Sequence, residues 1–230
     1  MEEHSFTTQE IDSFRQWHMW FVNKEWDKIT VPTGRPEMAL IAITKLVCVD
    51  PFTDAVAAAM ERVDPRPLMT RMYQLVRYDA SVSCFRWYVE RLPPVLSHEE
   101  GDDYLMIVGE SIPLLFHVLY YDRDTASDMI DLLFAHGVDP NEQAFHGMTA
   151  VIWWVTVHIR RWREGQLLGD RMNVVRRLLE AGCDPLLEDR EGRTVFDYVA
   201  YIEEEVKRLG TWTEVVEECR VLVALLREWA

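Results

Sequence analysis

Long apolar runs are missing from this sequence: no stretch approaches the roughly 18 apolar residues that a membrane-spanning helix needs. The first ten residues, M-E-E-H-S-F-T-T-Q-E, also lack the apolar segment of a secretory signal peptide. The spacings of common catalytic sites are missing too, since GxSxG, GxxxxGK[ST], GxGxxG and HExxH do not occur. We therefore expect a cytoplasmic protein with no catalytic residues that a motif could identify.

Cysteine is sparse and scattered. The chain has four cysteines, Cys48, Cys84, Cys183 and Cys219. None forms a CxxC pair or lies close to a histidine, so the spacing argues against zinc and predicts buried free thiols in a reducing compartment. The acidic segment 93–109 lacks the alternating oxygen ligands of a calcium loop. We therefore expect no cofactor and no metal.

Positive charge is in short supply. Only 24 basic residues stand against 39 acidic ones, which gives a formal net charge of -15. Nucleic acids and anionic membranes both require a positive protein surface, so the composition disfavours them as partners. Two interpretations stay open: a solvated acidic exterior, or an acidic surface that meets a partner with a basic surface.

What the sequence does contain is a repeated phrase. Apolar residues make up 49% of the chain, which is typical of a folded protein. An apolar helix end, a glycine, an Asp-Pro pair, a polar turn, a second glycine and a threonine occur twice, from Gly137 to Thr149 and from Gly182 to Thr194. Glycine suits the left-handed end of a helix, proline forbids its continuation, and threonine caps the next helix. The phrase predicts a unit of helix, turn and helix.

This unit resembles the ankyrin repeat. The segments 147–152 and 192–197 match the family's Gly-x-Thr-Pro-Leu-His opening, and 174–184 matches its Val-Val-x-x-Leu-Leu-x-x-Gly-Ala-Asp close. The chain departs from the pattern where Ile152 and Asp197 occupy the histidine position, Ala150 and Val195 the proline position, and Trp154 a small alanine position. The resemblance implies an all-α, ankyrin-like helical-repeat solenoid with short turn hairpins and helical caps.

The same resemblance implies one continuous repeat domain over residues 1–230. We predict an N-terminal helical cap over 1–30, divergent helix pairs and an acidic loop over 31–109, recognisable repeats over 110–200, and a C-terminal cap over 201–230. Helices are predicted near 7–28, 38–47, 53–63, 68–78, 79–92, 125–136, 194–209 and 211–229. Further helices are predicted to start near 112, 149 and 174, and the one from 149 is expected to run on into 158–171 before a short loop returns.

An insertion interrupts the second recognisable repeat. Thr149 lies 25 residues before Val174, where the family spacing is about 13. The surplus falls in 158–171, which holds three arginines around Trp162. Two interpretations stay open. Either these side chains form an exposed interface, or the arginines pair internally while Trp162 packs on an extended helix.

Ankyrin repeats bind proteins through their turn tips and concave helix face, so the resemblance implies a protein-interaction module, an adaptor or an inhibitor. The predicted partner-binding residues are Phe145, His146, Met148, Arg160, Arg161, Trp162, Arg163, Glu188, Arg190, Glu191 and Arg193.

The alternative is an enzyme or small-ligand binder with an aromatic-lined pocket. Its lining would be Trp153, Trp154 and Tyr198, beside Asp197 or His117. His117 falls where the family has a small apolar residue, which predicts a packed core histidine. Asp197, at a helix start, is interpreted either as a local cap or as a general base.

Overall fold

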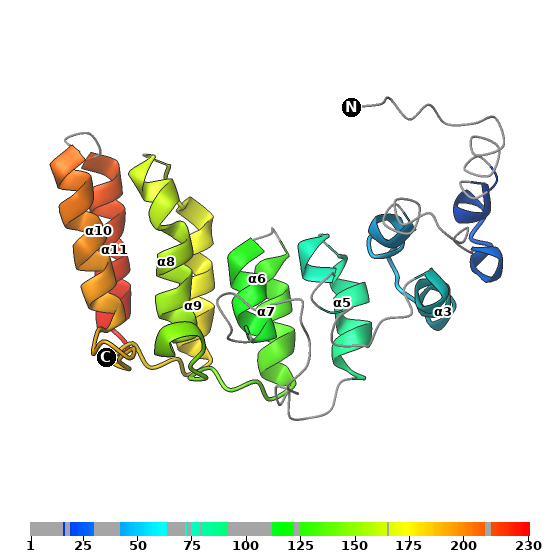
Figure 1. The fold of residues 1–230 in the computed structure, drawn as a ribbon, viewed down its shortest axis with the longest axis horizontal. Coiled ribbons are helices and arrows are strands. Elements are labelled where there is room, and N and C mark those ends of the chain that lie inside the picture. Colours follow the sequence, from blue (N-terminus) through cyan, green and yellow to red (C-terminus); the bar gives the residue numbers. More distant parts are fainter. Residues whose placement is uncertain are drawn as a thin grey trace. The chain divides into compact units, whose positions relative to one another are not determined.

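The computed structural model describes residues 16, 19–29, 42–63, 72, 75–78, 80–91, 112–121, 125–164, 166–209 and 213–230. The acidic segment 93–109 and the start of the predicted N-terminal helix lie outside these residues. The described residues form helices joined by turns, with one isolated bridge between Ala144 and Met148 (Figure 1). They fall into two compact units, 1–88 and 89–230. A single continuous repeat domain stays a prediction.

In the first unit, the N-terminal helix is shorter than its apolar pattern indicates. Residues 19–22 are helical, but the predicted continuation to Lys28 is wrong. Lys24 adopts a left-handed backbone with φ 57°, the conformation that ends a helix, and the chain then forms the short 3-10 helix η1 (Trp26–Lys28). Apolar spacing carried no signal of this stop, because lysine rarely occupies such a position.

Two longer helices of the first unit, α3 (Asp54–Val63) and α5 (Val82–Val89), fall inside helices that the sequence predicts. They are joined by side chains as well as by packing. The Trp87 indole N–H donates to Asp54 Oδ1 at 2.7 Å, and the Phe52 ring meets the Trp87 ring edge-on with centroids 5.8 Å apart. Aromatic pairs of this geometry stabilise cores beyond the area that they bury.

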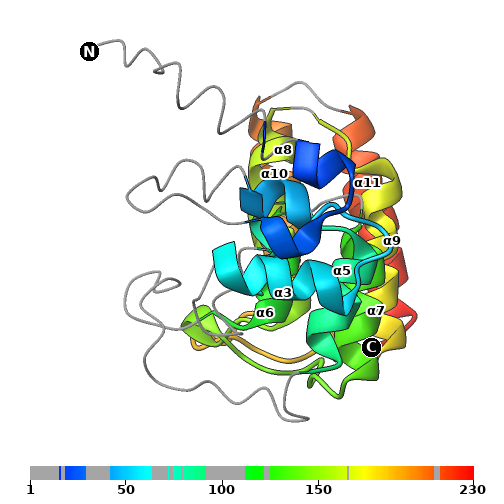
Figure 2. The same ribbon diagram turned by 90° about the vertical axis from the view of Figure 1, so that its right-hand side faces the viewer.

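The described residues of the second unit form three helix pairs. Their members are α6 (Leu114–Tyr121), α7 (Ala126–Ala135), α8 (Ala150–Arg163), α9 (Met172–Glu180), α10 (Val195–Leu209) and α11 (Thr213–Arg227). The first helices α6, α8 and α10 lie side by side, and so do the second helices α7, α9 and α11 (Figures 1 and 2). The predicted all-α helical-repeat fold class is confirmed, and within the described residues no helix has the length and apolarity to cross a membrane.

The repeated phrase folds as its residue types predict. Gly137 and Gly182 have φ values of 93° and 99°, so each ends a helix in the left-handed conformation. In both turns the N–H of the residue after the glycine donates to the carbonyl five residues earlier, at 3.1 and 3.0 Å. Thr149 and Thr194 immediately precede α8 and α10. The two turns are therefore equivalent structures 45 residues apart.

The core of the second unit is unusually rich in tryptophan. Helix α8 is buried continuously from Ala150 to Val155, and both Trp154 and Trp162 are inaccessible to solvent. Their rings meet edge-on with centroids 6.2 Å apart. Trp154 stands where the ankyrin pattern has alanine. It packs against a second tryptophan, Trp162, two turns later in the extended part of α8.

Candidate interaction face

Each of the two turns closes on itself in the same way. The backbone N–H groups of Ala144 and Asp189 donate to the carbonyls of Met148 and Arg193, at 3.0 and 2.9 Å. The glycine of each turn is left-handed, with φ near 75° at Gly147 and 73° at Gly192. The three residues between the two closing positions of each turn therefore form a tight tip. Figure 2 shows the tip before α8 projecting on the side of the first-helix row.

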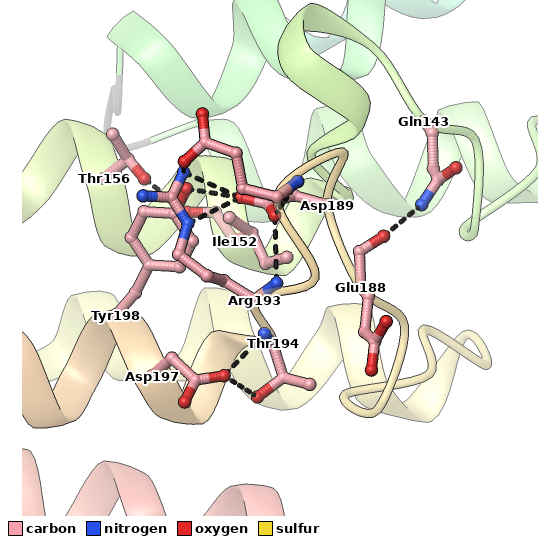
Figure 3. A network of polar contacts seen from close by, with 10 residues as sticks. Gln143, Ile152, Thr156, Glu188, Asp189, Arg193, Thr194, Asp197 and Tyr198 are labelled. Carbon is pink, nitrogen blue, oxygen red and sulfur yellow. Dashed lines mark hydrogen bonds and ion pairs between the residues drawn. The ribbon is translucent and has the colours of Figure 1, made fainter.

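Adjacent turns are also joined to each other by amide side chains. The Asn141 side chain donates to the Gly182 carbonyl at 2.9 Å and accepts from the Asp184 N–H at 2.7 Å. The Gln143 side chain donates to the Glu188 carbonyl at 2.8 Å (Figure 3). These amides satisfy backbone groups that helix ends and turns leave unpaired. The two turns therefore form one preorganised edge.

A buried carboxylate anchors the second tip. Asp189 accepts hydrogen bonds from the N–H groups of Glu191 and Arg193 at 2.8 and 3.0 Å. The Arg193 guanidinium donates at 2.9 and 3.0 Å, and the Tyr198 hydroxyl donates at 2.7 Å (Figure 3). The Arg193 guanidinium also lies over the Tyr198 ring, 4.8 Å from its centroid. One side chain thus fixes the tip, an arginine and the start of α10 together.

The electrostatics of this cluster follow from its hydrogen bonds. Burial alone would raise the pKa of the Asp189 carboxyl, but the hydrogen bonds from Arg193, Tyr198 and Glu191 outweigh burial and lower the pKa to about 2. Burial and the hydrogen bond to Asp189 raise the pKa of Tyr198 above its usual range. At neutral pH the cluster therefore holds an ionised aspartate, a protonated tyrosine and a cationic arginine.

The predicted turn-tip residues differ in accessibility. His146, Glu188, Arg190 and Glu191 are exposed. Met148 is only 7% exposed, because it belongs to the closing pair of its turn, so the prediction that it contacts a partner conflicts with its burial. Two predicted turn-tip residues remain. Arg193 is hydrogen-bonded to Asp189, and the Phe145 side chain lies outside the described residues.

The insertion corrects one of our expectations. Trp162 is fully buried, so the interpretation of an exposed interface tryptophan is wrong, and the alternative of a packed tryptophan is confirmed. Its indole N–H donates to Glu218 Oε2 at 2.6 Å. Arg161 is half-buried, whereas the Arg160 and Arg163 side chains lie outside the described residues. The helix extension that carries them brings Trp162 against α11, which local sequence spacing does not reveal.

Glu218 also holds the loop that returns from the insertion. Besides Trp162, its carboxylate accepts the N–H groups of Leu168 and Gly169 at 2.9 to 3.0 Å. Two backbone donors from the loop and the Trp162 indole of α8 thus converge on a single side chain of α11. Charge-assisted hydrogen bonds of this kind are stronger than neutral ones.

Replacing Glu218 with alanine is therefore expected to open this loop locally. Three donors lose their acceptor, at a cost of about 1–2 kcal/mol, so tryptic cleavage after Arg171 should be roughly five- to thirty-fold faster. Limited proteolysis with mass spectrometry measures the rate. Glu217→Ala is the control, since among the described residues the exposed Glu217 pairs with Arg220 alone, at 3.1 Å. Equal cleavage rates in the two variants would contradict the role given to Glu218.

The residues predicted to line a ligand pocket pack in the core or cap a helix instead. Trp153 and Trp154 belong to the core, and the Trp153 indole donates to the Phe116 carbonyl at 2.9 Å. His117 is buried as predicted, which lowers its pKa to about 4 and keeps it neutral at pH 7. Asp197 accepts the Thr194 N–H and hydroxyl, both at 2.8 Å, so its interpretation as a local cap is confirmed (Figure 3). Over the described residues, no three His, Cys, Asp or Glu side chains gather as a metal site requires.

Sequence reasoning missed Asp189 and Glu218 as determinants of this face. Asp189 stands where the preceding repeat has Ala144, so the repeat comparison gave no reason to select it. A usable signal was present, because an aspartate two residues before a turn residue often accepts that residue's N–H. Glu218 carried no such signal, since its partners lie about 50 residues earlier in the chain.

The first helices share a common register. The N–H groups of His117, Trp153 and Tyr198 each donate to the carbonyl four residues earlier, which belongs to the residue immediately before α6, α8 or α10. The residues one turn further along are Tyr120, Thr156 and Tyr201, which therefore occupy equivalent positions on neighbouring helices. Tyr120 and Tyr201 are 54% and 47% exposed, and Thr156 is half-buried. We call the solvent side of α6, α8 and α10 the first-helix face.

Comparison with known proteins gives little beyond this geometry. No protein-family model matches the sequence, and no curated protein matches it. Among solved structures, the chain is similar to the ankyrin repeat domain of Bcl-3, described as a unique member of the IkappaB protein family. The two are 16% identical, with a TM-score of 0.40, over 82% of this chain and 78% of that chain. Family membership stays a prediction that the chain's own turns and paired helices motivate.

Proposed function

We propose that the chain is a protein–protein interaction module, an adaptor or an inhibitor, that binds a partner through its turn tips and first-helix face. The observation that carries the proposal is the joined edge formed by the two turns. Asn141 and Gln143 tie the backbone of one turn to that of the next, while His146, Glu188 and Arg190 remain exposed at the tips. An edge that is fixed internally yet presents charged side chains outward suits recognition of another protein.

Preorganisation gives the proposal its energetic basis. A loop that must be ordered on binding costs about 0.5–1.5 kcal/mol for each immobilised side chain, and a prefixed turn reduces this cost. The turn backbones here are already held by the bonds at Asp189 and by the amides of the preceding turn. The acidic composition of the chain favours a partner with a basic surface, whose approach the long-range field would accelerate.

The proposal predicts that a charge exchange at the turn tips abolishes partner capture. The test variant combines Glu188→Lys with Arg190→Glu, and the matched control combines Glu180→Lys with Arg176→Glu on exposed positions of α9. Both variants keep the net charge. Affinity purification from native lysate with quantitative mass spectrometry should show at least about a tenfold loss of the same proteins for the turn variant alone.

Thermal melting by circular dichroism checks that both variants fold. The proposal is contradicted if turn and control variants capture the same proteins in equal amounts. A specific partner lost only by the α9 control would move the interface to the second helices.

A further inference from the structure

The exposed tyrosines of the first-helix face have a regular placement. Tyr120 on α6 and Tyr201 on α10 lie at equivalent helix positions, with Thr156 of α8 at the same position between them. Tyrosine is enriched at protein interfaces because it gives a large rigid contact area and one polar group. Tyr120 and Tyr201 are about half exposed, and the smaller Thr156 lies between them. The two rings therefore mark the ends of a line of equivalent positions across three helices.

Carboxylates flank the α10 ring. Asp197 and Glu204 stand four residues before and three residues after Tyr201, which places both beside it on the same helical surface. Both are exposed, and neither forms an ion pair with a described cation. Of the neighbouring cations, Lys207 pairs with Glu203 at 2.6 Å. Arg208 pairs with Glu205 at 2.9 Å and also interacts electrostatically with Tyr201.

The Asp197 carboxylate keeps its charge at neutral pH. The N–H and hydroxyl of Thr194 donate to it, and these hydrogen bonds lower its pKa below the usual value. Only one of its oxygens is used by Thr194, so the other has room for a further donor. Tyr201 therefore has an exposed carboxylate on each side of it along α10, Asp197 and Glu204.

The chain itself shows how such a group of residues accepts a cation. One turn earlier on α10, the Arg193 guanidinium lies over the Tyr198 ring at 4.8 Å and pairs with the Asp189 carboxylate at 2.9 Å. A ring face and a carboxylate together are known to hold guanidinium and ammonium groups. Tyr201 with Asp197 and Glu204 repeats this chemistry on the exposed surface, where a cation from another molecule can reach it.

We propose that the first-helix face binds an extended, basic segment of a partner protein, with an arginine or lysine between Asp197, Tyr201 and Glu204 and an apolar or aromatic side chain on Tyr120. This rests on the proposed function and specifies the partner's chemistry. Adjacent helix axes lie about 10 Å apart, so α6 and α10 are separated by roughly 20 Å. An extended chain rises about 3.3 Å for each residue, which puts the two anchors about six residues apart.

Labelled peptides test both the chemistry and the spacing. The probe peptide carries one arginine and one phenylalanine about six positions apart in a glycine–serine background. Its control has the same composition with the two residues two positions apart. Fluorescence anisotropy against the full chain at low salt should give a dissociation constant about tenfold lower for the longer spacing. Replacing the peptide arginine with glutamate should abolish binding, because the site is negative.

Variants of the chain locate the contact. Tyr201→Ala and Glu204→Gln should each weaken binding of the longer peptide, by about tenfold and several-fold. Tyr201→Phe keeps the ring face and should bind like the original. Glu214→Gln, at an exposed position of α11, removes the same charge elsewhere and should leave binding unchanged.

The result can separate this inference from the proposed function. Equal affinity for the two spacings, or full binding by Tyr201→Ala, overturns the inference. If the lysate partner is lost by the turn-tip exchange but retained by Tyr201→Ala and Glu204→Gln, the proposed function stands and the extended-segment site fails. If peptide binding follows the expected pattern while the turn-tip exchange leaves partner capture unchanged, the extended-segment site stands. The proposal that the turn tips bind the partner is then wrong.

Discussion

Replacing Trp154 with alanine is expected to lower the free energy of unfolding of the second unit by about 3–5 kcal/mol. Trp154 is fully buried on α8, with its ring edge-on to Trp162 at 6.2 Å and 4.4 Å from the His158 ring centroid. Removing it leaves a cavity beside the two rings that it contacts on the same helix. Urea unfolding followed by circular dichroism at 222 nm measures the loss, and hydrogen exchange in α8 localises it.

The control for this prediction is Trp154→Phe. Within the described residues the Trp154 indole N–H has no hydrogen-bond partner, so phenylalanine removes a buried unsatisfied donor along with some volume. These two effects oppose each other, and the net loss is expected to stay below about 1.5 kcal/mol. A loss below about 1 kcal/mol for Trp154→Ala would mean that the packing around this ring contributes little.

The second large effect is expected from Asp189→Ala, at about 2–3 kcal/mol of unfolding free energy. The substitution leaves the Tyr198 hydroxyl, two backbone N–H groups and the Arg193 guanidinium without their shared acceptor. Arg193 is half-buried and can reach water, which limits the penalty. Asp184→Ala is the control, because within the described residues the exposed Asp184 carboxylate accepts the Leu186 N–H alone, at 2.8 Å, and its loss should cost less than about 1 kcal/mol.

This loss depends on pH in a defined direction. The folded-state pKa of Asp189 is about 2, below the value of about 3.9 expected for an unfolded aspartate. Its contribution is therefore complete above pH 4 and disappears as the pH falls from about 4 to about 2. The difference in urea midpoint between the original chain and Asp189→Ala should shrink over that interval. A difference that is constant from pH 7 to pH 2.5 would contradict the ionised-acceptor interpretation.

The turns and second-unit helices could be predicted because local sequence determines them. A left-handed glycine, the proline after it and a threonine cap act over a few residues, so Gly137, Gly182, Thr149 and Thr194 mark their elements correctly. The position of Asp197 at a helix start likewise indicated a cap as one of two interpretations, and its hydrogen bonds from Thr194 confirm that one. These signals require no knowledge of what packs against the helix.

Which side chains the interaction face exposes could not be predicted in the same way, because contacts with residues distant in the sequence determine their burial. Trp162 looked suited to the surface beside its arginines, and it is buried because Glu218 of α11 accepts its indole N–H. Asp189 is hidden because Tyr198 and Arg193 converge on it from the start of α10. Composition fixes the sign of the surface charge, but it cannot say which charges are already neutralised.

The amide links between turns give the array a polarity. The earlier turn supplies side chains, Asn141 and Gln143, and the later turn supplies backbone groups. The corresponding positions 45 residues later hold Leu186 and Glu188, which lack the amide. The two turns are therefore not interchangeable. A further repeat added after the second turn would lack the two amide links that join the first turn to the second. The substitutions Leu186→Asn and Glu188→Gln would supply those two amides.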